Sequence, residues 1–126
     1  MSDGQFQLGK DLINSKYEKS DIDMIEKLKS ISPDFYNILV EFGFGKVWTR
    51  KILNTQSQEI VAITALITMG CVPELLKVHF HTALNSGPTS EEVKEIILLA
   101  SIYIGIPKSI NAFFVLQSVL DERAKK

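Results

Sequence analysis

The sequence predicts an all-α protein, a compact bundle of about six or seven helices. Residues that start and end helices recur at regular intervals along the 126 residues. No segment alternates apolar and polar residues with the period of two that a strand needs. With 45% hydrophobic residues, the chain is long enough to bury one core without disulfides or metal ions. No linker or internal repeat divides it, so we expect a single domain over residues 1–126.

The first predicted helix covers Ser20–Ser30, where apolar residues recur at helical spacing. Ser32 followed by Pro33 starts the next helix, because proline loses no hydrogen bond at the first helical position and a serine caps the free N–H groups. This helix should end near Gly43. A short aromatic connector, Phe44–Arg50, should follow it.

The middle of the chain predicts two further helices with clear ends. Asn54 is the first of several capping residues before a helix that runs to about Met69 and stops at Gly70. This helix, SQEIVAITALITM, has almost no polar face, and such a helix must be covered on every side. The next helix covers Pro73–Ser86, and Gly87 closes it.

Two more helices complete the predicted bundle. Thr89 and Glu92 form a capping box for a helix over Ser90–Ile104, which ends at Gly105. Pro107 opens the last helix, whose apolar residues again occupy more than one face. Two helices too apolar for a monomer of this size predict a subunit interface. The charged tail, DERAKK, should fray into solvent.

Charge and composition argue against several classes of protein. Lys and Arg total 14 and Asp and Glu total 15, and the cations are scattered, which argues against a nucleic-acid groove. The longest apolar run, Ile60–Val72, is too short to cross a bilayer. No basic segment followed by an apolar one opens the chain, so we see no export signal and expect a cytoplasmic protein. Cys71 is the only cysteine, which excludes an internal disulfide.

His79 is the residue whose position most favours chemistry. It shares an apolar helix face with Leu75, Leu76 and Ala83. The other face, which we expect to be solvated, carries His81 together with Glu74, Lys77 and Asn85. The alternative is that His79 is a core histidine satisfied by one hydrogen bond. Histidines at i and i+2 cannot reach one metal ion from the same helix face, and we predict no metal and no cofactor.

A longer pattern of residues also carries information about function. An arginine precedes the long apolar helix, a histidine is followed by an alanine and a glycine, and a capped acidic helix start leads to a tyrosine-glycine-proline signature. These positions are Arg50, His79, Ala83, Gly87, Glu91, Glu92, Glu95, Ala100, Tyr103, Gly105 and Pro107. In their order and spacing, the residues from Phe35 to Leu120 resemble the carboxymuconolactone decarboxylase family.

This resemblance implies an alkylhydroperoxidase D-like helical fold with its core at about residues 35–120. It also implies a ring-shaped homo-oligomer, typically a hexamer built as a trimer of dimers, with the active site near a subunit boundary. The implied reaction is the cofactor-free decarboxylation of gamma-carboxymuconolactone, a small carboxylated substrate. Loss of CO2 leaves electrons on a carbon conjugated to the lactone carbonyl, so the protein must stabilise a dienolate and protonate it.

Under this hypothesis each candidate residue has a role and a structural alternative. His79 is the proton donor, because its ordinary pKa lies near neutrality. Glu59 would orient the ring or shuttle the proton, or it is simply an acid favoured in the first turn of its helix. Arg50 would bind a substrate carboxylate, or it only caps a helix or forms a rim ion pair. Trp48 and Tyr103 would line the substrate site, or they are packing residues.

One position departs from the family pattern and weakens the choice of substrate. The residue that opens the long helix is often arginine in this family, whereas here it is Gln58. Losing this charge would loosen recognition of an anionic lactone, so a related acid is an alternative substrate.

Two other functions are compatible with the sequence. Relatives in the superfamily carry a redox Cys-x-x-Cys, and here Glu59 and Cys71 match the glutamate and the first cysteine, but Glu74 replaces the second. Because a disulfide needs a second thiol, Cys71 would require one from a partner or another subunit. As a structural alternative, Cys71 is a small hydrophobic residue at a helix end. A third possibility is an oligomeric protein without catalytic activity.

Overall fold

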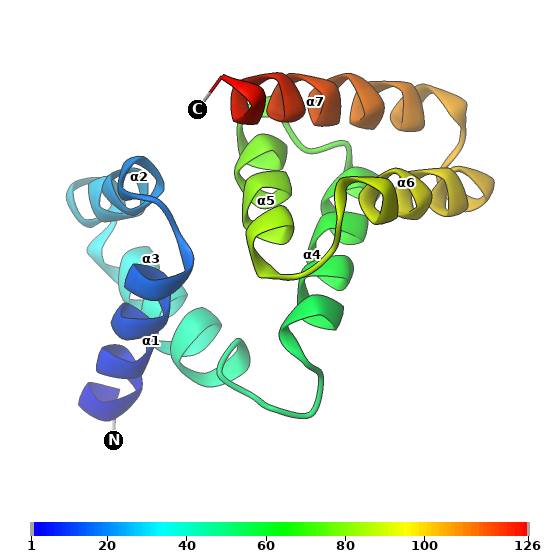
Figure 1. Cartoon of the computed structure of the whole chain (residues 1–126). Coiled ribbons are helices and arrows are strands. Elements are labelled where there is room, and N and C mark those ends of the chain that lie inside the picture. The colour runs from blue at the N-terminus through cyan, green and yellow to red at the C-terminus, as the bar shows by residue number, and fades with distance from the viewer. Residues whose placement is uncertain (1, 126) are drawn as a thin grey trace. The chain divides into compact units, whose positions relative to one another are not determined.

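The computed structural model describes residues 2–125, and these residues form helices and connectors without any strand (Figure 1). The helices are α1 (Ser2–Lys16), α2 (Lys19–Ile31), α3 (Pro33–Ile38), the π-helix η1 (Leu39–Val47), α4 (Thr55–Met69), α5 (Pro73–Ser86), α6 (Ser90–Ile104) and α7 (Ile106–Ala124). The all-α prediction is confirmed. The chain divides into an N-terminal unit that ends at Leu53 and a C-terminal unit that begins at Asn54. We describe each unit by itself, and the expectation of a single domain remains a prediction.

In the N-terminal unit, α1 packs directly against η1 through two glycines. A Cβ atom on Gly9 would lie 2.0 Å from the carbonyl oxygen of Val40, and one on Gly45 would lie 2.1 Å from the carbonyl oxygen of Gln5. Both distances are far below van der Waals contact, so neither position has room for a side chain. The helix backbones therefore touch, and Ile13 is buried close to this contact.

The prediction for this region was wrong in two respects. The helix that begins at Pro33 does not end near Gly43, because α3 runs without a break into η1 and the helical backbone continues to Val47. The N–H of Trp48 donates to the carbonyl of Gly43, five residues earlier, at 3.0 Å. Neither Gly43 nor Gly45 ends the helix, and Gly45 permits close packing on α1, so most of the predicted connector is helical. Helix α1, which the sequence analysis did not predict, is the partner that this packing requires.

A polar cluster, which we call the Glu26 cluster, joins α1, α2 and α3. Its members are Lys10, Glu26, Lys29 and Tyr36. The Tyr36 hydroxyl donates to Glu26 Oε2 at 2.6 Å, Lys10 Nζ lies 2.6 Å from the same oxygen, and Lys29 Nζ lies 2.9 Å from Oε1. These donors, Lys10 first, lower the pKa of Glu26 from 4.5 to about 2. Burial raises the pKa of Tyr36, whose residue surface is only 2% exposed.

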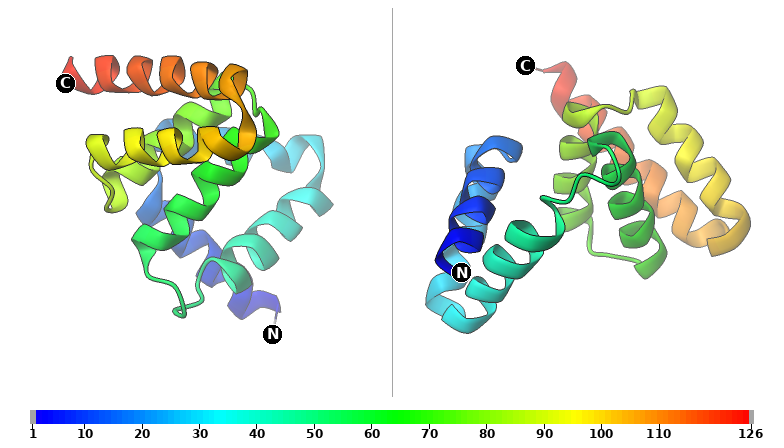
Figure 2. Two further views of the ribbon diagram at one scale, coloured as in Figure 1. Left: turned by 90° about the vertical axis from the view of Figure 1, so that its right-hand side faces the viewer. Right: turned by 90° about the horizontal axis from the view of Figure 1, so that it is seen from below.

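The C-terminal unit is built from two helix pairs. Helix α4 ends at Gly70, whose φ of 72° is in the left-handed region that favours glycine, and α5 then runs back along α4. Gln56 at the start of α4 therefore lies against Gly87 at the end of α5. Helices α6 and α7 form the second pair and lie side by side (Figures 1 and 2). The core between the helices contains Ile63, Ile67, Leu76, Phe80, Ala83, Val93, Ile97, Ala112, Val115, Leu116 and Val119.

Local capping signals place these helices as predicted. The Asn54 side chain accepts a hydrogen bond from the N–H of Ser57 at 2.8 Å, and Thr89 and Glu92 form both bonds of the capping box. The prediction that the charged tail frays was wrong, because α7 stays helical to Ala124. Residues in this last turn bind α5, as described below.

Candidate active site

Glu59 is a fully buried carboxyl group on α4. It is the fifth residue of the helix and therefore lies past the first turn, with 0% of its surface exposed. The alternative interpretation, in which Glu59 is only an acid favoured in the first turn, is wrong. Acids are rarely buried to this degree, and a buried acid in a small domain marks a position where chemistry is plausible.

His79 lies on α5, the helix that packs antiparallel to α4. Its side chain is half-buried, and its Nδ1 atom is shielded from solvent. Of its predicted neighbours, Leu76 and Ala83 are buried in the core, whereas Leu75 is exposed. The structure thus places Glu59 and His79 on adjacent helices of the same unit.

Cys71 lies in the short connection between α4 and α5. Its backbone N–H donates to the carbonyl of Leu66 at 3.2 Å, and its side chain is half-buried. Glu74, at the position of the second cysteine in the redox pattern, is exposed in the first turn of α5. Cys71 therefore lies directly after the C-cap of α4.

Tyr103 is 83% exposed near the end of α6. The alternative interpretation, in which this tyrosine packs against the core, is therefore wrong. Its neighbours on α6 and α7 form an apolar surface with exposed Leu98, Leu99, Ile102, Ile106, Ile110 and Phe114.

Two other candidates, Trp48 and Arg50, belong to the N-terminal unit. Trp48 stacks on Phe44 with ring centroids 6.5 Å apart, and Lys16 Nζ lies 4.4 Å from the centroid of the indole ring. These contacts give Trp48 a packing role in its own unit. Arg50 is exposed just after η1, and its backbone N–H donates to the carbonyl of Val47.

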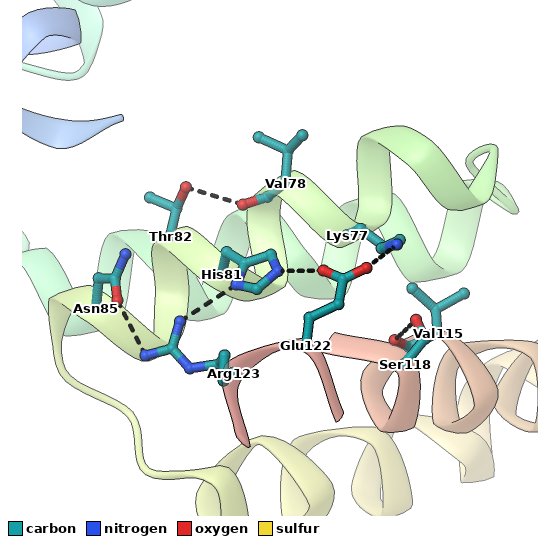
Figure 3. A network of polar contacts seen from close by, with 9 residues as sticks. All are labelled: Lys77, Val78, His81, Thr82, Asn85, Val115, Ser118, Glu122 and Arg123. Carbon is teal, nitrogen blue, oxygen red and sulfur yellow. Dashed lines mark hydrogen bonds and ion pairs between the residues drawn. The ribbon is translucent and has the colours of Figure 1, made fainter. Parts of the chain in front are cut away.

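The sequence analysis misplaced His81, which is not on a solvated face. Its side chain is only 15% exposed and lies between two consecutive residues of α7, Glu122 and Arg123 (Figure 3). His81 Nε2 is 2.9 Å from Glu122 Oε1, and His81 Nδ1 is 3.2 Å from Arg123 Nη1. Lys77 donates to the other oxygen of Glu122, and Arg123 Nη2 donates to Asn85 Oδ1 at 3.0 Å. We call these five residues the α5–α7 clamp.

Arginine has only N–H donors, so Arg123 donates to Nδ1 of the His81 ring. The other ring nitrogen, Nε2, donates to Glu122. Hydrogen bonds from Lys77 and then His81 lower the pKa of Glu122 from 4.5 to about 2.

A weak sequence signal for the clamp exists. Lys77, His81 and Asn85 are spaced four residues apart and thus form one stripe of α5, which the sequence analysis grouped correctly but expected to face solvent. Their partners are 38 to 45 residues away in the sequence, and only the packing of α7 on α5 brings them into contact.

Two kinds of feature are absent from residues 2–125. These residues contain no group of three or more His, Cys, Asp or Glu side chains placed to hold a metal ion. In the same range, every helix is too short or too polar to span a bilayer.

Comparison with known proteins gives consistent matches. The family model described as the carboxymuconolactone decarboxylase family matches residues 33–118, a range that includes all the candidate site residues. The chain is 34% identical over 98 residues to a 4-carboxymuconolactone decarboxylase of Acinetobacter baylyi, covering 78% of this chain and 72% of that protein. It is 25% identical over 124 residues to a nitrosuccinic acid decarboxylase of Metarhizium robertsii, covering 98% and 84% respectively. It is also 30% identical over 110 residues to an uncharacterised 15.0 kDa protein of Paracoccus denitrificans, covering 86% and 80%.

Proposed function

Because the chain belongs to the carboxymuconolactone decarboxylase family, we propose that it is a carboxy-lyase that acts on gamma-carboxymuconolactone or a related small carboxylated lactone. The observation that carries this proposal is the match over residues 33–118, which contains a buried acid and a half-buried histidine on two adjacent helices.

The names of two relatives define the chemistry in general terms. A carboxylated lactone and nitrosuccinic acid both lose a carboxylate from a carbon whose electrons an electron-withdrawing group can accept. The first intermediate is then a stabilised carbanion, and the enzyme's remaining task is to deliver a proton to it. A reaction of this kind balances without a redox partner.

In the proposed mechanism the carbon–carbon bond to the carboxylate breaks and CO2 leaves. The electron pair stays on the carbon conjugated to the lactone carbonyl, and His79 transfers its ring proton to that carbon. Solvent then returns a proton to the ring. Glu59 would orient the imidazole or relay this proton, a role that its complete burial beside α5 supports.

Arg50 remains our candidate for binding a substrate carboxylate, since its fork of N–H donors matches the two oxygens. Trp48 and Tyr103 remain candidates for contacts with the substrate. Replacing Arg50 by glutamine should raise KM more than it lowers kcat. Equal kinetic constants in the Arg50→Gln variant would remove it from the site.

We also propose that the protein is a homo-oligomer. The family resemblance implies a hexamer. The large apolar residues exposed on the two neighbouring helices α6 and α7 support this proposal, because exposed apolar surface is typical of an interface. Light scattering coupled to size exclusion measures the mass directly. A monomer of 14.1 kDa would contradict the proposal.

The direct test is the release of CO2 from two probes, 4-carboxymuconolactone and nitrosuccinic acid, by the purified full chain. We expect turnover of the lactone and at most slow turnover of the nitro acid. Turnover of nitrosuccinic acid alone would reject the lactone as substrate, and no CO2 from either probe would reject the carboxy-lyase. Consumption of a hydroperoxide in the presence of dithiothreitol, lost in Cys71→Ser, would instead support the redox function.

A further inference from the structure

The α5–α7 clamp joins one side of α5 to the last turns of α7. Two consecutive α7 residues, Glu122 and Arg123, bind three α5 side chains that span two helical turns (Figure 3). Contacts spread along the helix resist sliding, and contacts with both nitrogens of a single ring resist rotation. Behind them, Leu76 and Phe80 of α5 pack in the core with residues of α7. The clamp therefore fixes the rotation of α5 about its own axis.

His79 lies on the opposite side of the same helical turn from the centre of the clamp. Two residues correspond to about 200° of rotation around an α-helix, so His79 and His81 project in nearly opposite directions. A small rotation of α5 would move His81 out of its contacts with α7 and would displace the His79 ring by a similar amount. Displacements of about 1 Å in a reacting group cost on the order of 100-fold in rate.

We propose that the α5–α7 clamp positions His79 for proton transfer, with His81 and Arg123 as positioning residues and not as catalytic ones. This inference rests on the proposed function, in which His79 donates the proton. In the clamp, the guanidinium of Arg123 donates to Nδ1 of the His81 ring. The charged groups that contact this ring are Glu122 and Arg123, and Lys77 contacts it through Glu122.

The first arm of the test is kinetic. Arg123→Met removes the donors to His81 and Asn85, and we expect kcat to fall about 10- to 100-fold with KM within about 3-fold of wild type. Arg123→Lys, which keeps one donor, should recover part of the loss. Asp121→Asn is the matched control on the same helix, because Asp121 accepts a hydrogen bond from Gln117 within α7 itself, so the variant should leave kcat unchanged.

A double-mutant cycle separates positioning from general damage to the fold. If Arg123 acts through His79, Arg123→Met should slow the His79→Ala enzyme by less than 2-fold. An equal fold-loss in both backgrounds would overturn the proposal, and so would a folded Arg123→Met variant with wild-type kcat. Thermal melting establishes that each variant is folded at the assay temperature.

The second arm does not depend on activity. The chain has two histidines, so a spectrum of the protein with histidine labelled with ¹³C at Cε1 contains one signal from each ring, and the His81→Gln variant assigns the one from His79. We expect the His79 signal to shift or broaden in Arg123→Met and to stay in place in Asp121→Asn. An unmoved signal would overturn the inference. Inactivity of the wild type, or full activity of His79→Ala, would instead reject the proposed function, while the spectrum still decides whether the clamp controls His79.

Discussion

The Glu26 cluster and the α5–α7 clamp use the same electrostatic device in different settings. In each, side chains from other turns or helices donate hydrogen bonds to one carboxylate, three to Glu26 and two to Glu122, and its pKa falls to about 2. The Glu26 cluster surrounds the hydroxyl of a buried tyrosine and joins three helices of the N-terminal unit. The clamp contains a histidine with a partner at each ring nitrogen and contacts the helix that carries His79.

The difference between them lies in what each cluster holds in place. Loss of the Glu26 cluster should cost stability in its own unit and nothing else. Loss of the clamp should change the orientation of a candidate catalytic group. Variants of the Glu26 cluster should therefore change stability, whereas variants of the α5–α7 clamp should change the reaction rate.

The largest effect is expected at His79 itself. Removing a proton donor typically costs 100-fold or more, so kcat of His79→Ala should fall by at least about 100-fold. Steady-state decarboxylation measures this, and added imidazole should restore part of the rate if the lost group was a donor. Tyr36→Phe, in the Glu26 cluster, should retain the wild-type kcat. A His79→Ala enzyme that decarboxylates at the normal rate would contradict the mechanism.

The next effect is expected in the Glu26 cluster. Tyr36→Phe keeps the buried ring but removes the hydroxyl that donates to Glu26 at 2.6 Å. Hydrogen bonds to charged groups contribute about 1.5–3 kcal/mol, and partial exposure of Glu26 reduces this to about 1–2 kcal/mol of unfolding free energy. Urea denaturation measures the loss. Tyr103→Phe is the matched control, because that hydroxyl is on an exposed residue and its removal should leave the midpoint unchanged.

Both clusters should make stability depend on pH in the acidic range. The pKa values of Glu26 and Glu122 are lower in the folded chain than their ordinary value of 4.5, so their ionised forms favour folding. This contribution is complete above about pH 4.5 and is lost as the pH falls towards 2. The urea midpoint should therefore decrease over that window, and less steeply in Glu26→Gln and in Glu122→Gln. Unchanged slopes in both variants would show that other groups control acid unfolding.

The smallest effect is expected at Cys71, which lies outside both clusters. Cys71→Ser should leave the rate of decarboxylation within about 2-fold of wild type and should not move the urea midpoint of the N-terminal unit. The same preparations, assayed with a hydroperoxide, separate the two candidate functions. A large loss of decarboxylase activity in Cys71→Ser would place the thiol in the reaction.

The sequence predicted those parts of the fold that depend on local backbone chemistry. The Asn54 cap, the Thr89 and Glu92 capping box and the helix ends at Gly70 and Gly105 each involve neighbours within a few residues. The errors concern features that depend on distant segments. Gly43 predicted a helix end, but the helix continues to Val47, and the role of the nearby Gly45 becomes clear only when α1 lies against it.

The candidate site also contains features that local sequence predicts and features that depend on distant segments. The burial of Glu59 and the half-burial of His79 agree with an apolar helix pair that local patterns define. The contacts of His81 could not be predicted from the sequence of α5 alone, because its partners on α7 are more than 40 residues away. A charged stripe on a helix can face solvent or an oppositely charged turn, and only tertiary packing distinguishes the two.

The contact between α1 and η1 has a consequence for how freely this chain can vary. Gly9 and Gly45 have backbone atoms within about 2 Å of where a methyl group would be, whereas Gly4 has open space and Gly43 meets only a leucine methyl at ordinary distance. A library of single substitutions, selected for soluble expression, should thus be depleted of every replacement at positions 9 and 45 and should retain alanine at positions 4 and 43. Whether a glycine of this protein can be replaced therefore depends on whether a neighbouring backbone atom already occupies the position of the added Cβ.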